Sequence, residues 1–355
     1  MNFTLSPAPN LTKTFNVNNT PDVAKEPAKS FAYNNAIKPA VSNQSIAKRH
    51  IPYVLIRPDI HKHTDNQPRT LEPSYSDIDI DQTRLSTMMR IPSGEIYRNV
   101  LTKIGKDTSF DEKIKFVHWP ETNKSAFILD PRYDTLMKGV IRNFMYYMNP
   151  QGWNLIIMSY SGHKTQIEKD FPTCRFIPID DAIITKNHKT GEYNIRVEDY
   201  NRIFRSASFW RTLPEKIAVF QKDCVMYRMF ADHFADYYDY AGANFYNTPS
   251  PIYGGMNGGF SLRKRDVMIE CIEKVNMRDP RQPNVEIEIN EDVFFTHACE
   301  QLRKLVPDKI HRTFLAIEID TNTETSAYHG WHHNYHDSEF ALYMVSRSEF
   351  LREYL

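Results

Sequence analysis

Residues 216–223 read Lys-Ile-Ala-Val-Phe-Gln-Lys-Asp, an apolar run of strand length that ends in a carboxylate. Similar apolar runs precede it along the chain, at 125–129, 153–160 and 174–179. Apolar residues at helical spacing lie between these runs, at 134–148, 163–170 and 198–210. Short apolar strands alternating with helices are typical of a mostly parallel sheet covered by helices on both faces. The sequence therefore predicts an α/β fold.

The end of the 216–220 strand is the first candidate site. In such sheets, ligands bind beyond the carboxyl ends of the strands, so Asp223 is expected at the ligand edge. A carboxylate there is a hard oxygen ligand for Mg²⁺ or Mn²⁺, which neutralises a nucleotide diphosphate. Position alone favours a helix cap equally well.

Composition excludes several classes of protein. The 355 residues contain 44 Lys+Arg and 44 Asp+Glu, and this neutral balance argues against nucleic acid as a partner. Four cysteines without a CxxC motif indicate free thiols rather than a disulfide scaffold or a zinc finger. No apolar run approaches the roughly 18 residues of a membrane span, and the N-terminus has no secretory signal core. We therefore expect a soluble, cytoplasmic protein.

The N-terminal region differs from the rest of the chain. Residues 1–70 carry nine Lys/Arg against four Asp/Glu, and the first fifty hold eight Asn with few apolar residues. Such a stretch buries too little apolar surface to offset its ordering entropy, so 1–50 is predicted to be a disordered or loosely docked basic arm of low complexity. The other predicted regions are an accessory or linker region at 51–119, the main domain at 120–336 and an amphipathic helix at 337–355. Residues 276–290 are interpreted as an exposed loop or insertion.

Three further clusters carry chemistry. Four glycines fall within residues 254–259, which is typical of a tight turn or of a backbone that approaches a ligand. Asn290-Glu291-Asp292 precedes an apolar helix. These residues are interpreted either as a charged helix N-terminus or as the source of a general base for an acceptor. Four histidines fall within 329–336, as a metal-binding or a surface cluster.

The order of these blocks resembles a poorly characterised family of glycosyltransferase-like domains of unknown function, related to the GT-A nucleotide-sugar transferases. The resemblance covers about 120–336. Its blocks are Asp130-Pro131-Arg132 with Trp153, Tyr200-Asn201-Arg202 through Ser208-Phe209-Trp210, Phe220-Gln221-Lys222-Asp223, Tyr238-Asp239-Tyr240-Ala241-Gly242-Ala243, Asn257-Gly258-Gly259-Phe260-Ser261-Leu262-Arg263, Glu291-Asp292-Val293-Phe294-Phe295 and Gly330-Trp331-His332. It implies a GT-A-like, Rossmann-like sheet. The abundance of Asn, Ile, Lys and Tyr beside few Gly also hints at an A/T-rich genome, as in some large DNA viruses.

The resemblance also implies roles for single residues. Asp223 and His332 would hold Mn²⁺ or Mg²⁺, with His333 as an adjacent competitor, and Asp292 with Glu291 would face the acceptor as catalytic groups. The residues implied to bind the nucleotide-sugar are Arg132, Gln221, Asp223, Asn257, Gly258, Gly259 and Arg263. The two arginines are interpreted either as partners of the diphosphate or as members of structural ion pairs. Gln221 replaces the first Asp of the metal-binding DxD motif of GT-A enzymes and brings no charge to a metal.

The function expected is transfer of a sugar from a nucleotide-sugar donor to a hydroxyl of a glycan or protein acceptor. One alternative is a catalytically silent domain that binds a nucleotide-sugar, a glycan or a partner, which Gln221 favours. Another is a metal-dependent hydrolase that uses the histidine cluster. The sequence leaves open the donor, the stereochemistry and whether the chain forms a homo-oligomer.

Overall fold

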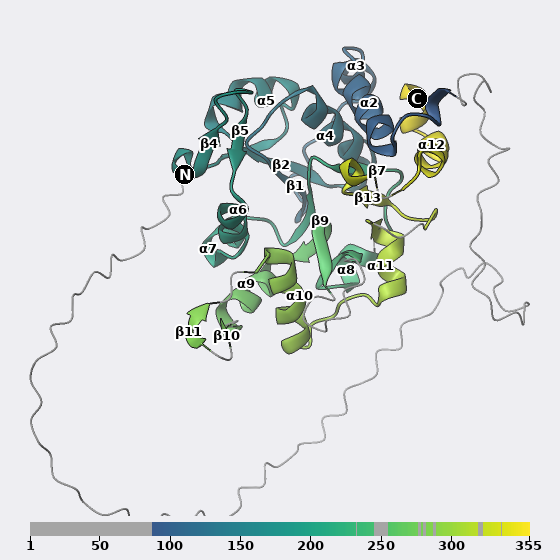
Figure 1. Ribbon diagram of the computed structural model, residues 1–355. Coiled ribbons are helices and arrows are strands. Elements are labelled where there is room, and N and C mark those ends of the chain that lie inside the picture. Colours follow the sequence, from purple (N-terminus) through teal and green to yellow (C-terminus); the bar gives the residue numbers. More distant parts are fainter. Residues whose placement is uncertain are drawn as a thin grey trace, which may run out of the picture. The chain divides into compact units, whose positions relative to one another are not determined.

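The central sheet of the computed structural model is mixed, with its parallel strands on one side (Figure 1). The structure describes residues 87–231, 233–244, 255–275, 278–279, 282–286, 289–318, 322–334 and 336–355. Within these ranges the strand order is β3-β2-β1-β6-β9-β8. The strands are β1 (Lys124–Leu129), β2 (Asn154–Ser159), β3 (Arg175–Pro178), β6 (Lys216–Phe220), β8 (Tyr240–Asn244) and β9 (Met256–Lys264). β3, β2, β1 and β6 run parallel, whereas β9 is antiparallel to both β6 and β8.

Helices cover both faces of this sheet. The residues of β1 alternate between two hydrophobic clusters, with Ala126 and Ile128 in one and Phe127 and Leu129 in the other. The first cluster contains the buried face of α4 (Thr135–Met148), and the second contains side chains of the helices on the opposite face. Those helices are α6 (Val197–Phe204), α7 (Ala207–Trp210), α9 (Arg265–Lys274) and α10 (Glu291–Gln301). The predicted α/β class, with a mostly parallel sheet flanked by helices, is confirmed.

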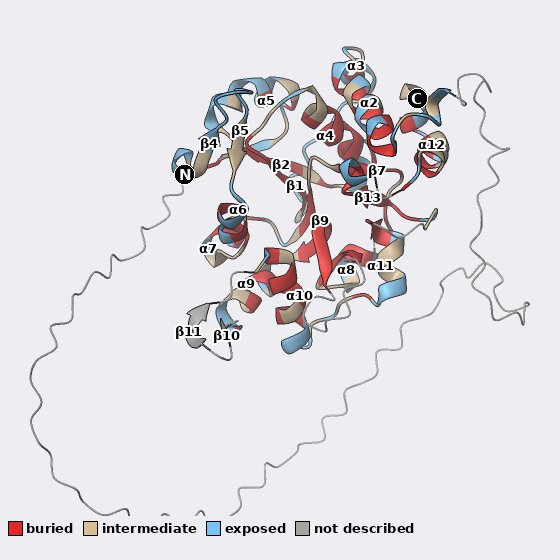
Figure 2. Ribbon diagram, viewed as in Figure 1, coloured by how far each residue is buried: buried red, intermediate tan, exposed pale blue. Residues whose placement is uncertain are grey.

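Two glycines let helices α2 (Ser93–Lys106) and α4 cross closely. A Cβ placed on Gly105 would lie 1.9 Å from the backbone oxygen of Thr135, and one on Gly139 would lie 1.8 Å from that of Leu101. The apolar side chains of α2 enter the same cluster as α4 and β1. α12 (Ser338–Arg347) and a final turn, η7 (Leu351–Tyr354), also pack on α2, and Figure 2 shows their buried faces. The described part of the predicted accessory region thus shares the core of the main domain.

Smaller elements surround the sheet. The strands β7 (Cys224–Met226), β12 (Ala316–Ile317) and β13 (Ala327–His329) form a short three-stranded sheet, and β4 (Ile184–Lys186) pairs with β5 (Tyr193–Ile195). Where a loop was expected at 276–290, β10 (Arg278–Asp279) pairs antiparallel with β11 (Gln282–Glu286). The other helices and turns are α3 (Phe110–Lys113), η3 (Asn149–Gln151), η4 (Ser161–His163), α5 (Lys164–Asp170), η5 (Asp181–Ile183), α8 (His233–Tyr237), α11 (Lys309–Leu315) and η6 (Trp331–His333).

Some predictions fall beyond what the structure describes. The basic arm at 1–50 and the accessory region up to residue 86 lie outside the described residues, so both stay predictions. The predicted C-terminal helix at 337–355 corresponds to α12 followed by η7. In the described part of the chain, each helix is too short or too polar to cross a bilayer.

Candidate active site

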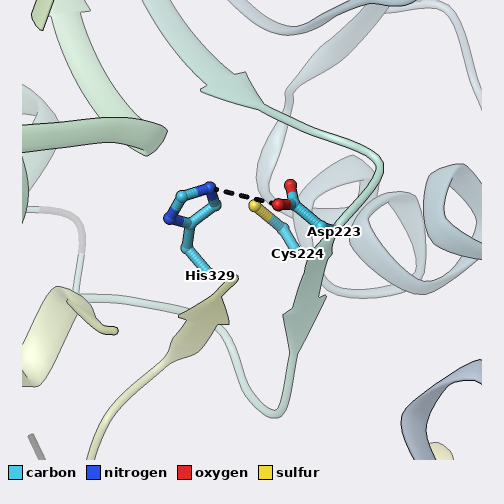
Figure 3. Close-up of side chains that lie close together, drawn as sticks. All are labelled: Asp223, Cys224 and His329. Carbon is cyan, nitrogen blue, oxygen red and sulfur yellow. Dashed lines mark ion pairs between the residues drawn. The ribbon is translucent and has the colours of Figure 1, made fainter. Parts of the chain in front are cut away.

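The site forms where β7 and β13 run side by side at the end of β6. β6 ends at Phe220, residues 221–223 turn, and β7 begins at Cys224. Cys224 pairs with His329 in the antiparallel ladder between β7 and β13, and the backbone oxygen of Asp223 accepts a 3.0 Å hydrogen bond from the amide of Gly330. Figure 3 shows the resulting group, in which His329 faces Asp223. The ladder therefore brings the predicted carboxylate and the late histidines together.

Two histidines hold the Asp223 carboxylate. Its Oδ2 lies 3.1 Å from Nδ1 of His332 and 3.5 Å from Nε2 of His329. Burial opposes ionisation of Asp223, but the charge of His329 and the hydrogen bond from His332 outweigh it and lower the pKa of the carboxyl to about 2. The same hydrogen bond raises the pKa of His332. Asp223 is therefore an anion at neutral pH, as a metal ligand must be.

Gln221 bridges the histidine to the opposite wall. Its Nε2 donates to the Tyr200 hydroxyl at 2.9 Å, and its Oε1 lies 3.2 Å from Nε2 of His329. Since Gln221 Oε1 and Asp223 Oδ2 are both acceptors, this arrangement places the ring proton of His329 on Nε2. Nδ1 of the same ring is buried without a hydrogen-bond partner, 3.8 Å from Oε1 of Glu318. Burial lowers the pKa of His329.

The carboxyls of Glu318 and Asp292 belong to the same site as Asp223. Burial, with the charges of Asp223 and Asp292, raises the pKa of Glu318 to about 7. Burial and the charge of Glu291 raise the pKa of Asp292 to about 7. Both carboxyls thus resist ionisation in the absence of a compensating cation. This is the electrostatic signature of a site that favours positive charge.

The Asn257-Gly258-Gly259 segment organises these side chains. Asn257 Nδ2 donates to Oε2 of Glu318 at 3.2 Å, and the amide of Gly258 donates to Oδ2 of Asp292 at 3.0 Å. The segment bulges out of the sheet, because Gly242 and Ala243 of β8 face Ser261 and Asn257 of β9. The residues implied to bind the nucleotide-sugar therefore position site carboxyls.

Arg263 and Glu291 form a fully buried ion pair. Arg263 Nη1 lies 2.6 Å from Oε2 of Glu291, and Nη2 lies 3.1 Å from Oε1. The guanidinium also packs against the rings of Phe204, Tyr240 and Phe295. Neither side chain is free for the role that the resemblance implies, diphosphate binding for Arg263 and catalysis for Glu291. Both roles would require this pair to break, so we interpret the pair as structural.

A pocket of about 870 Å³ opens beside these groups. Asp223, Gln221, Asp292 and His332 line it, as does Arg132. The Arg132 guanidinium is partly exposed and forms two hydrogen bonds with the carboxylate of Asp130, at 2.9 and 2.7 Å. Of the two arginines predicted to bind diphosphate, Arg132 is thus the one at the pocket wall.

The described residues place a possible metal-ligand group at Asp223, Cys224 and His329, whose ligand atoms lie within 4.8 Å of one another. Cys224 suits a metal poorly, since burial raises the pKa of its thiol well above the usual value and its Sγ donates to the backbone oxygen of Gly259 at 3.1 Å. The ionised carboxylate of Asp223 supplies the kind of oxygen ligand that Mn²⁺ and Mg²⁺ prefer.

Sequence reasoning missed two members of the site. His329 was recognised only as part of a histidine cluster, and Glu318 was not singled out at all. The signal for His329 is its place at the end of a short strand, β13, which parallels the placement of Asp223 after β6. Of the other two histidines in the cluster, His333 packs on the ring of His332, and His336 is buried between Tyr328 and Phe340. The four histidines do not converge on one metal.

The chain is similar to a family described as "Protein of unknown function (DUF5672)", which matches residues 186–328, less than half of the chain. This region contains β6, β9 and α10 but neither α2 nor His332. No curated protein sequence matches the chain.

Several solved structures are similar in fold. The apo form of the glycosyltransferase GlyE from Streptococcus pneumoniae TIGR4 has 10% identity and a TM-score of 0.38, over 62% of this chain and 62% of that one. The mannosyltransferase PcManGT from Pyrobaculum calidifontis, in complex with GDP-Man and Mn²⁺, has 10% identity and a TM-score of 0.32, over 63% and 67%. Mouse xyloside xylosyltransferase 1 has 11% identity and a TM-score of 0.33, over 58% and 97%. The match with the first spans less than two thirds of its length. At these scores, we base the function on the chain's own residues.

Proposed function

We propose that this chain is a glycosyltransferase that moves a sugar from a nucleotide-diphosphate sugar to a hydroxyl acceptor with the help of Mn²⁺ or Mg²⁺. The observation that carries the proposal is the ionised Asp223, held by His332 and His329 at the ligand edge of a parallel sheet. This group lies in the wall of a pocket of about 870 Å³, within the range of small-molecule sites.

Asp223 and His332 are the residues that would hold the cation. Two observations support a cation at this place. The first is the pair of ligand atoms, a carboxylate oxygen and an imidazole nitrogen. The second is the raised pKa values of Glu318 and Asp292, which a nearby cation would lower. The cation would offset the phosphate charge that develops as the nucleoside diphosphate leaves. His329 is a positioning residue, because its Nε2 faces both Asp223 and Gln221.

The donor would lie against the end of β1. Asp130, Arg132, Tyr200 and Asn201 line the pocket there. Arg132 presents a partly exposed guanidinium, which matches phosphate oxygens in pairs. Gln221 would act by holding Tyr200 and His329 rather than by binding a metal.

Asp292 would take the proton from the acceptor hydroxyl if the reaction inverts the anomeric centre. It lines the pocket, and its carboxyl is fixed by the amides of Gly258 and Val293. A carboxyl with a pKa of about 7 is a stronger base, when ionised, than an ordinary aspartate. Glu291 is instead committed to Arg263.

The test is a thermal-shift screen of UDP-, GDP-, CMP- and dTDP-sugars, each with Mn²⁺, Mg²⁺ or EDTA. A ligand at 100 times its Kd stabilises a fold by about 2.7 kcal/mol. We expect a metal-dependent shift for one nucleotide in the wild-type protein, lost in Asp223→Asn and His332→Ala. His333→Ala is the comparison variant, since His333 packs on the ring of His332, whereas Nδ1 of His332 makes the 3.1 Å contact with Asp223. A folded protein that shifts with no nucleotide would contradict the proposal.

A catalytically silent binding domain is the second candidate. It is favoured by Gln221, which replaces the first Asp of the GT-A metal-binding motif and is already bonded to Tyr200 and His329. This candidate predicts a nucleotide-sugar shift that survives EDTA and is accompanied by no release of nucleoside diphosphate. Metal-dependent release would rule it out.

A further inference from the structure

Helix α2 forms one wall of the pocket. Arg98, Thr102 and Lys106 line it, and their spacing of four residues places them on one face of the helix. α2 precedes both the segment matched by the family and the region 120–336. None of the roles discussed above uses this face.

Arg98 lies at the metal end of this wall. Its guanidinium is 5.6 Å from the ring centroid of Trp331, and its charge acts to lower the pKa of His332. Its ion pair with Glu95, at 3.3 Å, joins two side chains that are each about half exposed. Such a pair is weak and leaves the guanidinium able to bind an anion.

Lys106 lies two turns further along the helix. Eight residues at 1.5 Å each place it about 12 Å from Arg98 along the helix axis. Lys106 is exposed, and among the residues that the structure describes its ammonium has no hydrogen-bond or ion-pair partner. By contrast, Lys222 in the same pocket pairs with Asp134 at 2.5 Å. The α2 wall is therefore cationic, and Asp223 and Asp292 line the same pocket.

We propose that the α2 wall binds the phosphate group of a phosphorylated acceptor, with Lys106 as the main contact and Arg98 nearer to the reacting centre. The assignment of this phosphate to the acceptor rests on the proposed function, whereas phosphate binding itself does not. The wall is long enough to hold two different phosphate groups, that of the donor diphosphate and that of the acceptor. A donor diphosphate near Asp223 lies at the Arg98 end of the wall, whereas the backbone of Lys106 is about 12 Å further along the helix. Lys106 is thus placed for a second phosphate, on the other substrate.

The first experiment measures the anion site by itself. Isothermal titration of the full-length protein with inorganic phosphate and with glucose 1-phosphate, in EDTA and without nucleotide, gives a Kd for each. We expect Lys106→Ala to raise both values about three- to tenfold, the loss of one partly exposed charge-assisted contact. Lys103→Ala is the matched control, because Lys103 lies on the same helix and donates to the backbone oxygens of Tyr354 and Leu355. Absence of phosphate binding, or an equal loss in both variants, would overturn the proposal.

The second experiment distinguishes the two sources of phosphate. Titrations of UDP and GDP with Mn²⁺ are repeated on both lysine variants. We expect their Kd values to be unchanged by Lys106→Ala, and glucose 1-phosphate to bind in the presence of the nucleotide. If Lys106→Ala weakens the nucleotide as much as the sugar phosphate, the wall serves the donor and the acceptor assignment is wrong. If neither nucleotide binds but the phosphate titrations behave as expected, the transferase proposal is in question while the anion site stands.

Discussion

The ring of His329 occupies the space that a side chain at position 259 would fill. A Cβ placed on Gly259 would lie 1.9 Å from Cδ2 and 2.2 Å from Nε2 of His329. The ring is itself buried and faces Asp223. Gly259 is therefore required for the position of His329, although the two residues are far apart in the chain.

Gly259→Ala is expected to displace His329 and to destabilise the protein by about 1–3 kcal/mol, the usual cost of overpacking. Urea unfolding measures this change, and the Mn²⁺-dependent thermal shift should weaken with it. In Gly259→Ala/His329→Ala the added methyl has room, so the two effects should be less than additive. Strictly additive effects would show that the ring and the glycine are not coupled.

Gly139→Ala tests the close crossing of α2 and α4. In an exposed helix this change stabilises by about 1 kcal/mol, because alanine has the higher helix propensity. Here the added Cβ would meet the backbone of Leu101, which cannot move without shifting α2. We expect the opposite sign, a loss of about 1–3 kcal/mol in the free energy of unfolding. A gain in stability would mean that α2 does not pack on α4 in solution.

Glu291→Gln should destabilise the protein by about 3–5 kcal/mol, because it leaves the buried charge of Arg263 unpaired. Replacing both partners, in Arg263→Met/Glu291→Leu, should recover much of this loss. Urea titrations of the three proteins measure it. If Glu291→Gln retained wild-type stability and abolished only turnover, Glu291 would be a catalytic residue after all.

The pH dependence of stability tests Asp292. Its folded-state pKa, about 7, is above the ordinary value of 3.8, so the fold favours the protonated carboxyl. Stability is then lost as the pH rises from about 4 through 7. Asp292→Asn removes this loss, and its stability relative to wild type should improve by about 1–3 kcal/mol between pH 5 and pH 8. Thermal denaturation at the two pH values, in EDTA, measures the difference. Asp292→Asn also lowers the pKa of Glu318, because the charge of Asp292 helps to raise it, and this change shifts the difference in the same direction. A constant difference between the two proteins would contradict the raised pKa of Asp292.

The layered architecture follows from local patterns in the sequence. The apolar runs at 125–129, 153–160 and 216–220 predicted β1, β2 and β6 almost to the residue, because burial on both faces of a sheet leaves a continuous apolar pattern. The same logic placed Asp223 at the ligand edge, and the late histidine His332 does lie against it. Local patterns sufficed for these features because each depends on neighbours in the chain.

The contacts between polar groups, by contrast, depend on how distant elements pack. The sequence suggests a phosphate ligand at Arg263 and a base at Glu291. The two side chains pair instead, because α10 packs over β9. Glu318 and His329 join Asp223 through a ladder between strands about a hundred residues apart. The cationic face of α2 likewise reaches the pocket only because Gly105 and Gly139 let two helices approach. Such contacts depend on the free energy of the whole packed core, which no local stretch of sequence encodes.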